Sequence, residues 1–174
     1  MSIQPILLLG NPTLRQRCSP VQSVNSPETK ETIDHLRDTL ADFRERKGFG
    51  RGIAAPQIGI SQQLIYVKTD EVAGAFINPK IVSRSRKKFR MWDDCFSFPD
   101  ILACVERHYS IAVAYTDEQG KKKKLNAQGS LSELLQHEID HLHGVLAIDR
   151  AIDSHHIILR SEYETLSHKS PLSL

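Results

Sequence analysis

Two segments of the chain repeat apolar residues at the spacing of an amphipathic helix. The first starts at Ser26-Pro27, with Ser26 as N-cap and Pro27 at the first helical position. It runs to Lys47 and ends at Gly48, and its apolar positions are Ile33, Leu36, Leu40 and Phe43. The second starts at Ser130, and apolar residues surround most of it: Leu131, Leu134, Leu135, Ile139, Leu142, Val145 and Leu146. This second helix is predicted to be buried.

Short apolar runs between the two helices predict β-strands. They cover residues 64–67, 75–77, 81–83, 103–106 and 110–115. Asn78-Pro79 is expected to close the second strand, and the last strand leads into a hairpin-like turn at 117–120. Because the strands mostly precede a single buried helix, we predict an α+β fold with mainly antiparallel sheets around that helix.

Length and charge add broad limits. The 174 residues predict one domain over 1–166, followed by a flexible or loosely docked tail over 167–174 that has no periodic pattern. The 23 basic and 21 acidic residues nearly balance, so no specific nucleic acid is expected. The lysines at 121–124 are predicted to be a solvated strand edge. No secretory signal or membrane span is visible, which favours a cytoplasmic protein without a membrane partner.

The buried helix carries His137, Glu138 and His141 in the pattern H-E-x-x-H. Residues four apart lie on one face of a helix, so both histidines are able to bind one metal ion. Glu138 is close enough to act as general base on a water at that ion. A chance match, a zinc endopeptidase and a structural metal site are the alternatives. The apolar surroundings favour a metal, because buried histidines and acids need partners.

A catalytic centre of this kind needs a third protein ligand, and Cys95 is the best candidate. Taken alone, Cys95 is as well explained as a core thiol. Cys104 lies in an apolar run and is predicted to be a core thiol, and the odd number of three cysteines predicts no disulfide framework. Gln57 ends the small-residue run 50–57, where its amide is able to donate to an oxyanion or simply faces solvent from a turn.

Three segments, in this order, resemble the motifs of the peptide deformylase family. Residues 50–57 resemble the first motif, G-x-G-Φ-A-A-x-Q, and residues 93–97 resemble the second, Glu-Gly-Cys-Leu-Ser. Residues 136–141 match the third, Gln-His-Glu-x-Asp-His, and residues 6–21 resemble the opening segment of the family. The resemblance covers about residues 3–150.

The resemblance implies a hydrolase of protein biosynthesis that removes the N-formyl group from the N-terminal methionine of newly made polypeptides. Its partners would be a formylated peptide or nascent chain, with the ribosome as a further one. Glu138 would move the proton, Gln57 and the backbone N–H of Phe96 would hold the oxyanion, and Gly52 would bond the substrate backbone. The family's divalent ion is Fe²⁺, with Zn²⁺ or Ni²⁺ as substitutes, and its ligands here would be Cys95, His137 and His141.

The second motif departs from the family pattern at three positions. Asp93 replaces Glu, Asp94 replaces Gly, and Phe96 replaces Leu. Asp93 keeps a carboxylate, which Arg107 is expected to pair with. Asp94 adds a carboxylate beside Cys95, and any backbone angle that only glycine tolerates would be strained there.

The substrate pocket is the second point of departure. Ser130, Glu133 and Leu134 lie on the helix face of His137 and are predicted to contact substrate, together with Arg51, Gly52 and Asp94. In the family this face helps form an apolar pocket for methionine, which Ser130 and Glu133 suit poorly. Either Glu133 pairs with a cation at the rim, or the site takes a more polar or cationic formyl-amine. A weakly active homologue is the remaining alternative.

Overall fold

The computed structural model describes residues 2–169 and the side chains of residues 2–166. Its α-helices are α1 (Pro27–Lys47), α2 (Gly129–His141) and α3 (Arg160–Lys169). Its strands are β1 (Gly52–Ala54), β2 (Leu64–Lys68), β3 (Ala73–Arg84), β4 (Lys88–Asp94), β5 (Ile101–His108), β6 (Ser110–Thr116), β7 (Lys122–Gln128) and β8 (Ile157–Leu159). Within this described part, none of the helices combines the length and apolar character needed to cross a membrane.

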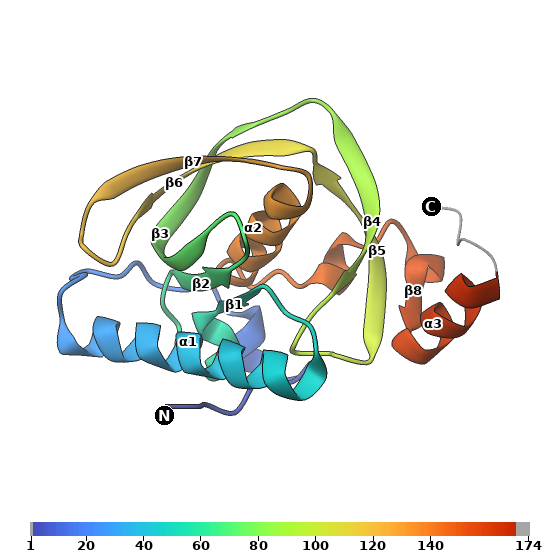
Figure 1. Cartoon of the computed structure of the whole chain (residues 1–174), viewed down its shortest axis with the longest axis horizontal. Helices are drawn as coiled ribbons and strands as arrows, with labels where there is room; N and C mark the ends of the chain where they lie inside the picture. Colours follow the sequence, from blue (N-terminus) through green and yellow to red (C-terminus); the bar gives the residue numbers. More distant parts are fainter. Residues whose placement is uncertain (1, 170–174) are drawn as a thin grey trace.

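Two antiparallel sheets enclose α2, as the sequence predicted. One has the strand order β1-β2-β3-β6-β7 and the other β4-β5-β8. Figure 1 shows α2 at the centre, between the large sheet and the long β4–β5 hairpin, while α1 runs along the opposite face of β1 and β2. The α+β prediction is therefore confirmed.

Strand β2 of the large sheet is covered on both faces, because α1 packs on one face and the α2 cluster on the other. Ile65 and Phe76 contact the α2 side of the core, whereas Leu64 and Ile77 join the cluster around α1. Successive side chains of a strand point to opposite faces, so a strand covered on both sides needs apolar residues throughout. This explains why residues 64–67 form an unbroken apolar run.

The ends of the helices depend on local caps. Helix α1 has the predicted bounds, with the Ser26 hydroxyl accepting from the N–H of Thr29 and Gly48 at a φ of 77°. Helix α2 ends at His141, so the expectation that Val145 and Leu146 extend it is wrong. The chain turns at Gly144, where a Cβ would lie only 2.4 Å from the Arg15 carbonyl oxygen.

Strand β3 does not end at Asn78-Pro79, contrary to the sequence prediction. Asn78 has a φ of 51°, and the register with β6 shifts between Ile77 and Lys80. Its side chain holds this irregularity by accepting from the N–H of Val21 at 2.8 Å and donating to the Val21 carbonyl at 2.9 Å. The strand therefore bends at a bulge and continues to Arg84, because a distant loop supplies the missing partners.

The charged edges of the fold follow the prediction only in part. Strand β7 lies at the edge of the large sheet, and the lysines at 121–124 are exposed, which confirms the solvated edge. Strands β1 and β8 and helix α3 were not predicted as elements. The predicted tail, residues 167–174, begins inside α3, and residues 170–174 lie outside the described part, so that prediction stays a prediction.

Leu135 is expected to be a stability-determining contact between α2 and the large sheet, because its side chain is fully buried in that cluster. We expect Leu135→Ala to lower the free energy of unfolding by about 2–5 kcal/mol through lost apolar burial and a residual cavity. Urea unfolding at matched metal content measures this. Leu166→Ala is the control, since Leu166 is 42% exposed; equal losses in both variants would contradict the packing described.

Candidate functional site

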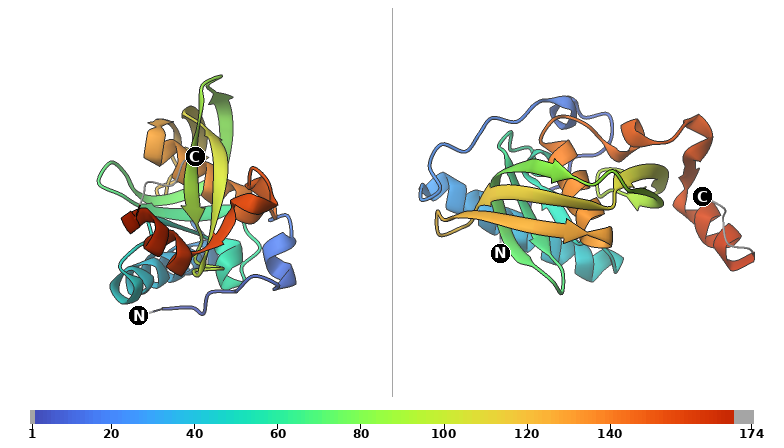
Figure 2. Two further views of the ribbon diagram at one scale, coloured as in Figure 1. Left: turned by 90° about the vertical axis from the view of Figure 1, so that its right-hand side faces the viewer. Right: turned by 90° about the horizontal axis from the view of Figure 1, so that it is seen from above.

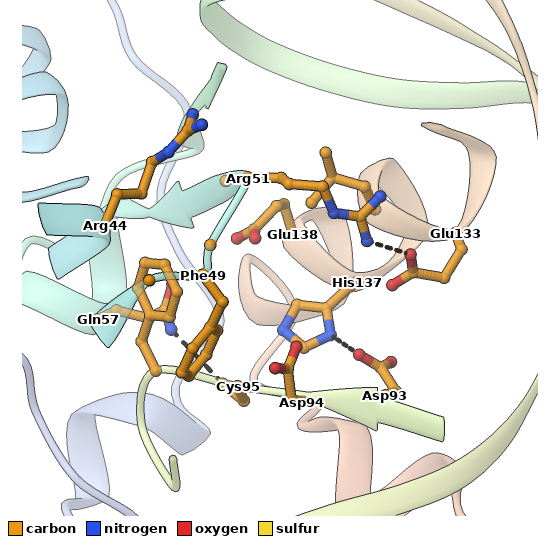
Figure 3. Close-up of a pocket in the computed structure, with 15 residues that line it drawn as sticks. Arg44, Phe49, Arg51, Gln57, Asp93, Asp94, Cys95, Glu133, His137 and Glu138 are labelled. Carbon is orange, nitrogen blue, oxygen red and sulfur yellow. Dashed lines mark hydrogen bonds and ion pairs between the residues drawn. The ribbon is translucent and has the colours of Figure 1, made fainter. Parts of the chain in front are cut away.

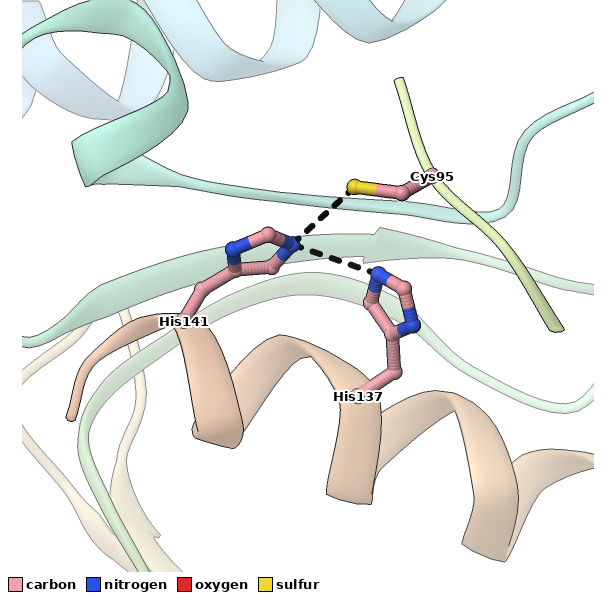
Figure 4. Close-up of side chains that lie close together, drawn as sticks. All are labelled: Cys95, His137 and His141. Carbon is pink, nitrogen blue, oxygen red and sulfur yellow. Dashed lines mark hydrogen bonds between the residues drawn. The ribbon is translucent and has the colours of Figure 1, made fainter. Parts of the chain in front are cut away.

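Helix α2 directs two imidazole rings to one point. The helix begins at Gly129, whose φ of 52° turns the chain out of β7. His137 and His141 follow one turn apart, and their Nε2 atoms lie 3.2 Å from each other (Figure 4). Both residues are buried, so neither ring nitrogen can rely on bulk water for a partner.

Cys95 brings a third donor atom to this point from the opposite sheet. It directly follows β4, and its Sγ lies 3.4 Å from Nε2 of His141 (Figure 4). The ligand atoms of Cys95, His137 and His141 all lie within 4.8 Å of one another. A thiolate with two imidazoles is a typical ligand set for a divalent transition-metal ion that keeps one position for water. These donors therefore fit such an ion.

Asp93 orients the first histidine. One oxygen of Asp93 lies 2.9 Å from Nδ1 of His137, and the other accepts from Arg107 at 3.0 Å. Burial alone would raise the pKa of Asp93, but His137 and Arg107 outweigh it and hold that pKa below its usual range. Arg107 also pairs with Asp140, which accepts from Arg150 at 2.8 Å. The predicted Asp93–Arg107 pair is present, and it fixes which His137 nitrogen faces Cys95.

Glu138 follows His137 on α2, and one of its carboxylate oxygens makes no hydrogen bond to the described residues. Its Oε2 is buried and bonds to none of the described residues. Burial raises the pKa of Glu138 to about 7, while the nearby charge of His137 opposes that rise. Gly52 makes room for this carboxylate, because a Cβ there would lie 2.8 Å from Oε1 of Glu138. The arrangement suits a polar or charged group bound between Glu138 and the donor cluster.

Gln57 is buried and faces the same cluster, which excludes the solvent-facing alternative. It sits in the short helix Ala55–Ile58, and its Oε1 accepts from the N–H of Ala54 at 2.9 Å. That bond fixes the amide orientation, so Nε2 lies 3.5 Å from Sγ of Cys95 and 3.3 Å from Oγ of Ser97. An N–H group that can donate a hydrogen bond is thereby held next to the ligand atoms of Cys95, His137 and His141.

These groups open onto a cavity of about 400 Å³, drawn in Figure 3. Its floor contains Cys95, His137 and Glu138, and its walls come from the segment after α1, from β4 and from α2. The lining residues are Arg44, Gly48, Phe49, Gly50, Arg51, Gly52, Gln57, Asp93, Asp94, Cys95, Phe96, Glu133, Leu134, His137 and Glu138. Of the predicted site residues, His141 and Ser130 are absent from this lining.

Arg51 and Glu133 form an ion pair across one wall of the cavity. A guanidinium N–H of Arg51 donates to Glu133 at 2.7 Å, and a second bonds to the hydroxyl of Ser130 (Figure 3 shows the pair). Burial raises the pKa of Glu133 and the charge of Asp93 adds to it, whereas Arg51 lowers it. Ser130 is exposed and reaches the site only through Arg51. Glu133 therefore has the cationic partner that one interpretation predicted.

Asp94 is also paired. Its carboxylate accepts from Arg160 at 2.7 Å, although the two residues are 66 positions apart. Position 94 does not need a backbone angle that only glycine tolerates, because Asn78 is the only non-glycine residue with positive φ among those described. Asp94 is the last residue of β4 and pairs with Leu102 of β5, so it has ordinary extended backbone.

Phe96 belongs to the core as well as to the cavity. Its ring stacks on Phe43 of α1 with centroids 3.8 Å apart and makes an edge contact with Phe49. A Cβ on Gly50 would overlap this ring at 2.3 Å, so the larger side chain requires glycine opposite it. Phenylalanine in place of the motif's leucine thus extends the α1 cluster to the rim of the cavity.

Sequence reasoning missed three residues around the cavity. Arg44 and Phe49 line it but belong to no recognised motif, and Arg160 contacts its rim from the far end of the chain. The only local signal was the position of Phe49 directly before the first motif.

The other two cysteines lie outside the site. Cys104 is a core thiol, as predicted, and burial raises its pKa. Cys18 is likewise buried, and its pKa is also raised by burial.

The sequence also matches known proteins along most of its length. The family model described as Polypeptide deformylase matches residues 3–156. The chain is 38% identical to Peptide deformylase 2 of Nostoc sp., covering 95% of this chain and 96% of that protein. It is 38% identical to the peptide deformylase of Rhizobium meliloti, covering 86% of this chain and 85% of the relative.

Solved structures give the same result for the fold. The peptide deformylase of Thermotoga maritima superposes with a TM-score of 0.81 at 33% identity, covering 88% of this chain and all of the other. That of Synechococcus elongatus, in complex with actinonin, has a TM-score of 0.79 at 32% identity and covers 97% of this chain and 86% of the other. The three sequence motifs, the convergent donor atoms and these matches agree: the chain belongs to the polypeptide deformylase family.

Proposed function

We propose that this cavity removes the formyl group from the N-terminal methionine of newly made polypeptides, as a metal-dependent peptide deformylase. The observation that carries the proposal is the convergence of three ligand atoms with Glu138 and Gln57 in one cavity, on a chain of this family. A formyl carbon is hindered only by hydrogen, so a cavity this closely walled is able to admit it and exclude larger acyl groups.

The metal ligands in this proposal are Cys95, His137 and His141. Thiolate and imidazole suit Fe²⁺, Zn²⁺ and Ni²⁺ alike, and we propose Fe²⁺ as the ion in vivo. When bound, such an ion acts as a Lewis acid and lowers the pKa of water. Asp93 and Arg107 contribute by holding the His137 ring in position.

Glu138 is proposed to carry the proton. Glu138 lines the cavity beside His137, and its carboxylate is able to take a proton from the attacking water. The same carboxylate then delivers the proton to the amine nitrogen that leaves. Because Glu138 is buried and Gly52 has no side chain, the carboxylate keeps this position without competition from bulk water.

Two N–H groups are proposed to hold the developing oxyanion. The Gln57 amide is oriented by its bond from Ala54 and directs Nε2 toward Cys95. The backbone N–H of Phe96 lies next to Cys95 in the chain and is the second donor. Gly52 is proposed to bond an extended substrate through its backbone, since its missing side chain allows close approach.

The structure does not favour the alternative of a cationic substrate. That hypothesis relied on free carboxylates at Asp94 and Glu133, but both carboxylates are paired with guanidinium groups at 2.7 Å. Arg51, Asp94, Glu133 and Leu134 line the cavity and are retained as proposed substrate-binding residues, with Ser130 acting through Arg51.

We propose that the reaction takes place in the cytoplasm, on nascent chains, with the ribosome as partner.

Substrate preference tests the proposal directly. Fe²⁺-loaded protein, kept anaerobic, is expected to release formate from formyl-Met-Ala-Ser with a kcat/KM at least about tenfold higher than from formyl-Lys-Ala-Ser, because Asp94 and Glu133 are already paired with guanidinium groups and do not attract a lysine side chain. Formate release is measured under identical conditions for both peptides. Faster turnover of the lysyl peptide would contradict the methionine assignment and restore the cationic alternative.

Glu138→Gln tests the proton carrier. Replacing the carboxylate by an amide of the same size is expected to lower kcat by about 10²–10⁴-fold, since the amide cannot accept the proton. Metal content, measured by elemental analysis, is expected to stay at the wild-type level. Glu106→Gln is the control, because Glu106 is an exposed partner of Lys88. A kcat close to wild type in metal-loaded Glu138→Gln would overturn this role.

Gln57→Ala tests the oxyanion donor. Loss of one preorganised N–H donor is expected to lower kcat by about 10²–10³-fold, with a smaller change in KM. Steady-state kinetics with formyl-Met-Ala-Ser measures both constants. Gln119→Ala, in the exposed turn between β6 and β7, serves as control. If Gln57→Ala changed only KM, the amide would be a ground-state contact rather than an oxyanion donor.

A further inference from the structure

The end of the chain packs against the hairpin that carries Cys95. Strand β8 pairs with the start of β5, and the Trp92 ring of β4 lies 5.8 Å from the ring of Tyr163 in α3. Figure 2 shows β8 and α3 at the end of the molecule, beyond the β4–β5 hairpin. Both elements follow residue 156, the last residue that the family model matches. The rim of the cavity is therefore supported by a segment outside the matched motifs.

Arg160 connects this segment to three parts of the rim. Its guanidinium donates to Asp94 at 2.7 Å and to the carbonyl oxygen of Pro99 at 2.8 Å, and its own backbone N–H donates to the carbonyl of Asp100 at 2.8 Å. The guanidinium carbon also lies 4.4 Å from the centroid of the Phe49 ring. One side chain thus contacts residues before and after Cys95 and a residue of the opposite wall.

The two contacts that reach the cavity are made by side chains and not by the metal ligand. Asp94 and Phe49 line the cavity, whereas Cys95 is buried and follows directly on the β4–β5 ladder. Asp94 and Arg160 retain 39% and 26% side-chain exposure, and ion pairs of such exposure contribute little to stability. Loss of the Asp94–Arg160 pair is therefore expected to change substrate binding at the rim and to leave the stability of the fold nearly unchanged.

We propose that Arg160 is a positioning residue for substrate binding, which neutralises Asp94 and holds the Phe49 ring at the rim. This inference rests on the proposed deformylase function. Without the guanidinium, Asp94 would present an uncompensated carboxylate to the carbonyl oxygens of an incoming formylated peptide. Phe49 would lose the cation over its ring and the restriction that it imposes. Both changes weaken substrate binding and leave the proton carrier and oxyanion donors in place.

The test is Arg160→Met, which keeps an extended side chain but removes the charge. With formyl-Met-Ala-Ser, KM is expected to rise about three- to fivefold while kcat stays within about twofold, the scale of one partly exposed charge interaction. Adding Asp94→Asn to this variant is expected to restore most of the wild-type KM, because the uncompensated carboxylate is removed. Arg160→Lys is expected to lie between wild type and Arg160→Met.

Arg15→Met is the matched control, since it breaks a similarly exposed pair with Asp149, and neither residue lines the cavity. Unchanged KM in Arg160→Met, or a second substitution that adds to the defect instead of correcting it, would overturn the inference. Absence of turnover in wild type would refute the proposed function instead. In that case the Kd of Met-Ala-Ser, measured by calorimetry, decides: equal Kd values for wild type and Arg160→Met overturn the inference.

Discussion

Every part of the site depends on the burial of α2 between two sheets. Partners for its ionisable side chains stabilise a buried helix, because an unpaired charge or polar group away from water costs several kcal/mol. The partners come from the residue just before β1, from β4, from β5, from α2 itself and from the segment after α2. The pairs are His137 with Asp93, Asp140 with Arg107 and Arg150, Glu133 with Arg51, and Gln136 with backbone and side-chain groups of His108 and Ser132.

This requirement links the metal ligands to a network of charges. Arg107 lies between two carboxylates, Asp93 on β4 and Asp140 on α2, and so joins the hairpin that carries Cys95 to the helix that carries the histidines. The distance between the thiol and the imidazoles is therefore set by an ion-pair network as well as by packing. A shorter acid at position 93 still reaches both His137 and Arg107, so the motif tolerates aspartate there.

Each departure from the family pattern is accompanied by a contact with a residue elsewhere in the chain. Phe96 stacks on Phe43, Asp94 pairs with Arg160, and Arg51 pairs with Glu133. A single substitution that leaves a charged or bulky group without a suitable contact is destabilising. The same substitution is tolerated when the residue that it contacts changes as well. The polar wall formed by Arg51 and Glu133 consequently carries no net charge, although Glu133 alone suggested a change of substrate.

The sequence by itself determined those features that depend on neighbouring residues. The cap at Ser26 and Gly48 fixed the bounds of α1, the apolar period marked α2 as buried, and the pattern of His137 and His141 selected the metal face. The three short motifs then identified the family. These features follow from local backbone preferences and from a periodicity that places residues on one face.

Only the tertiary structure decided which distant groups meet. The continuation of β3 through Asn78 depends on Val21, 57 residues away, and the charge at the rim depends on Arg160, 66 residues from Asp94. Likewise, Glu133 could be assigned to an ion pair only once Arg51, 82 residues away, was seen beside it. Such contacts are set by chain topology, because residues far apart in sequence have no spacing from which their meeting can be inferred.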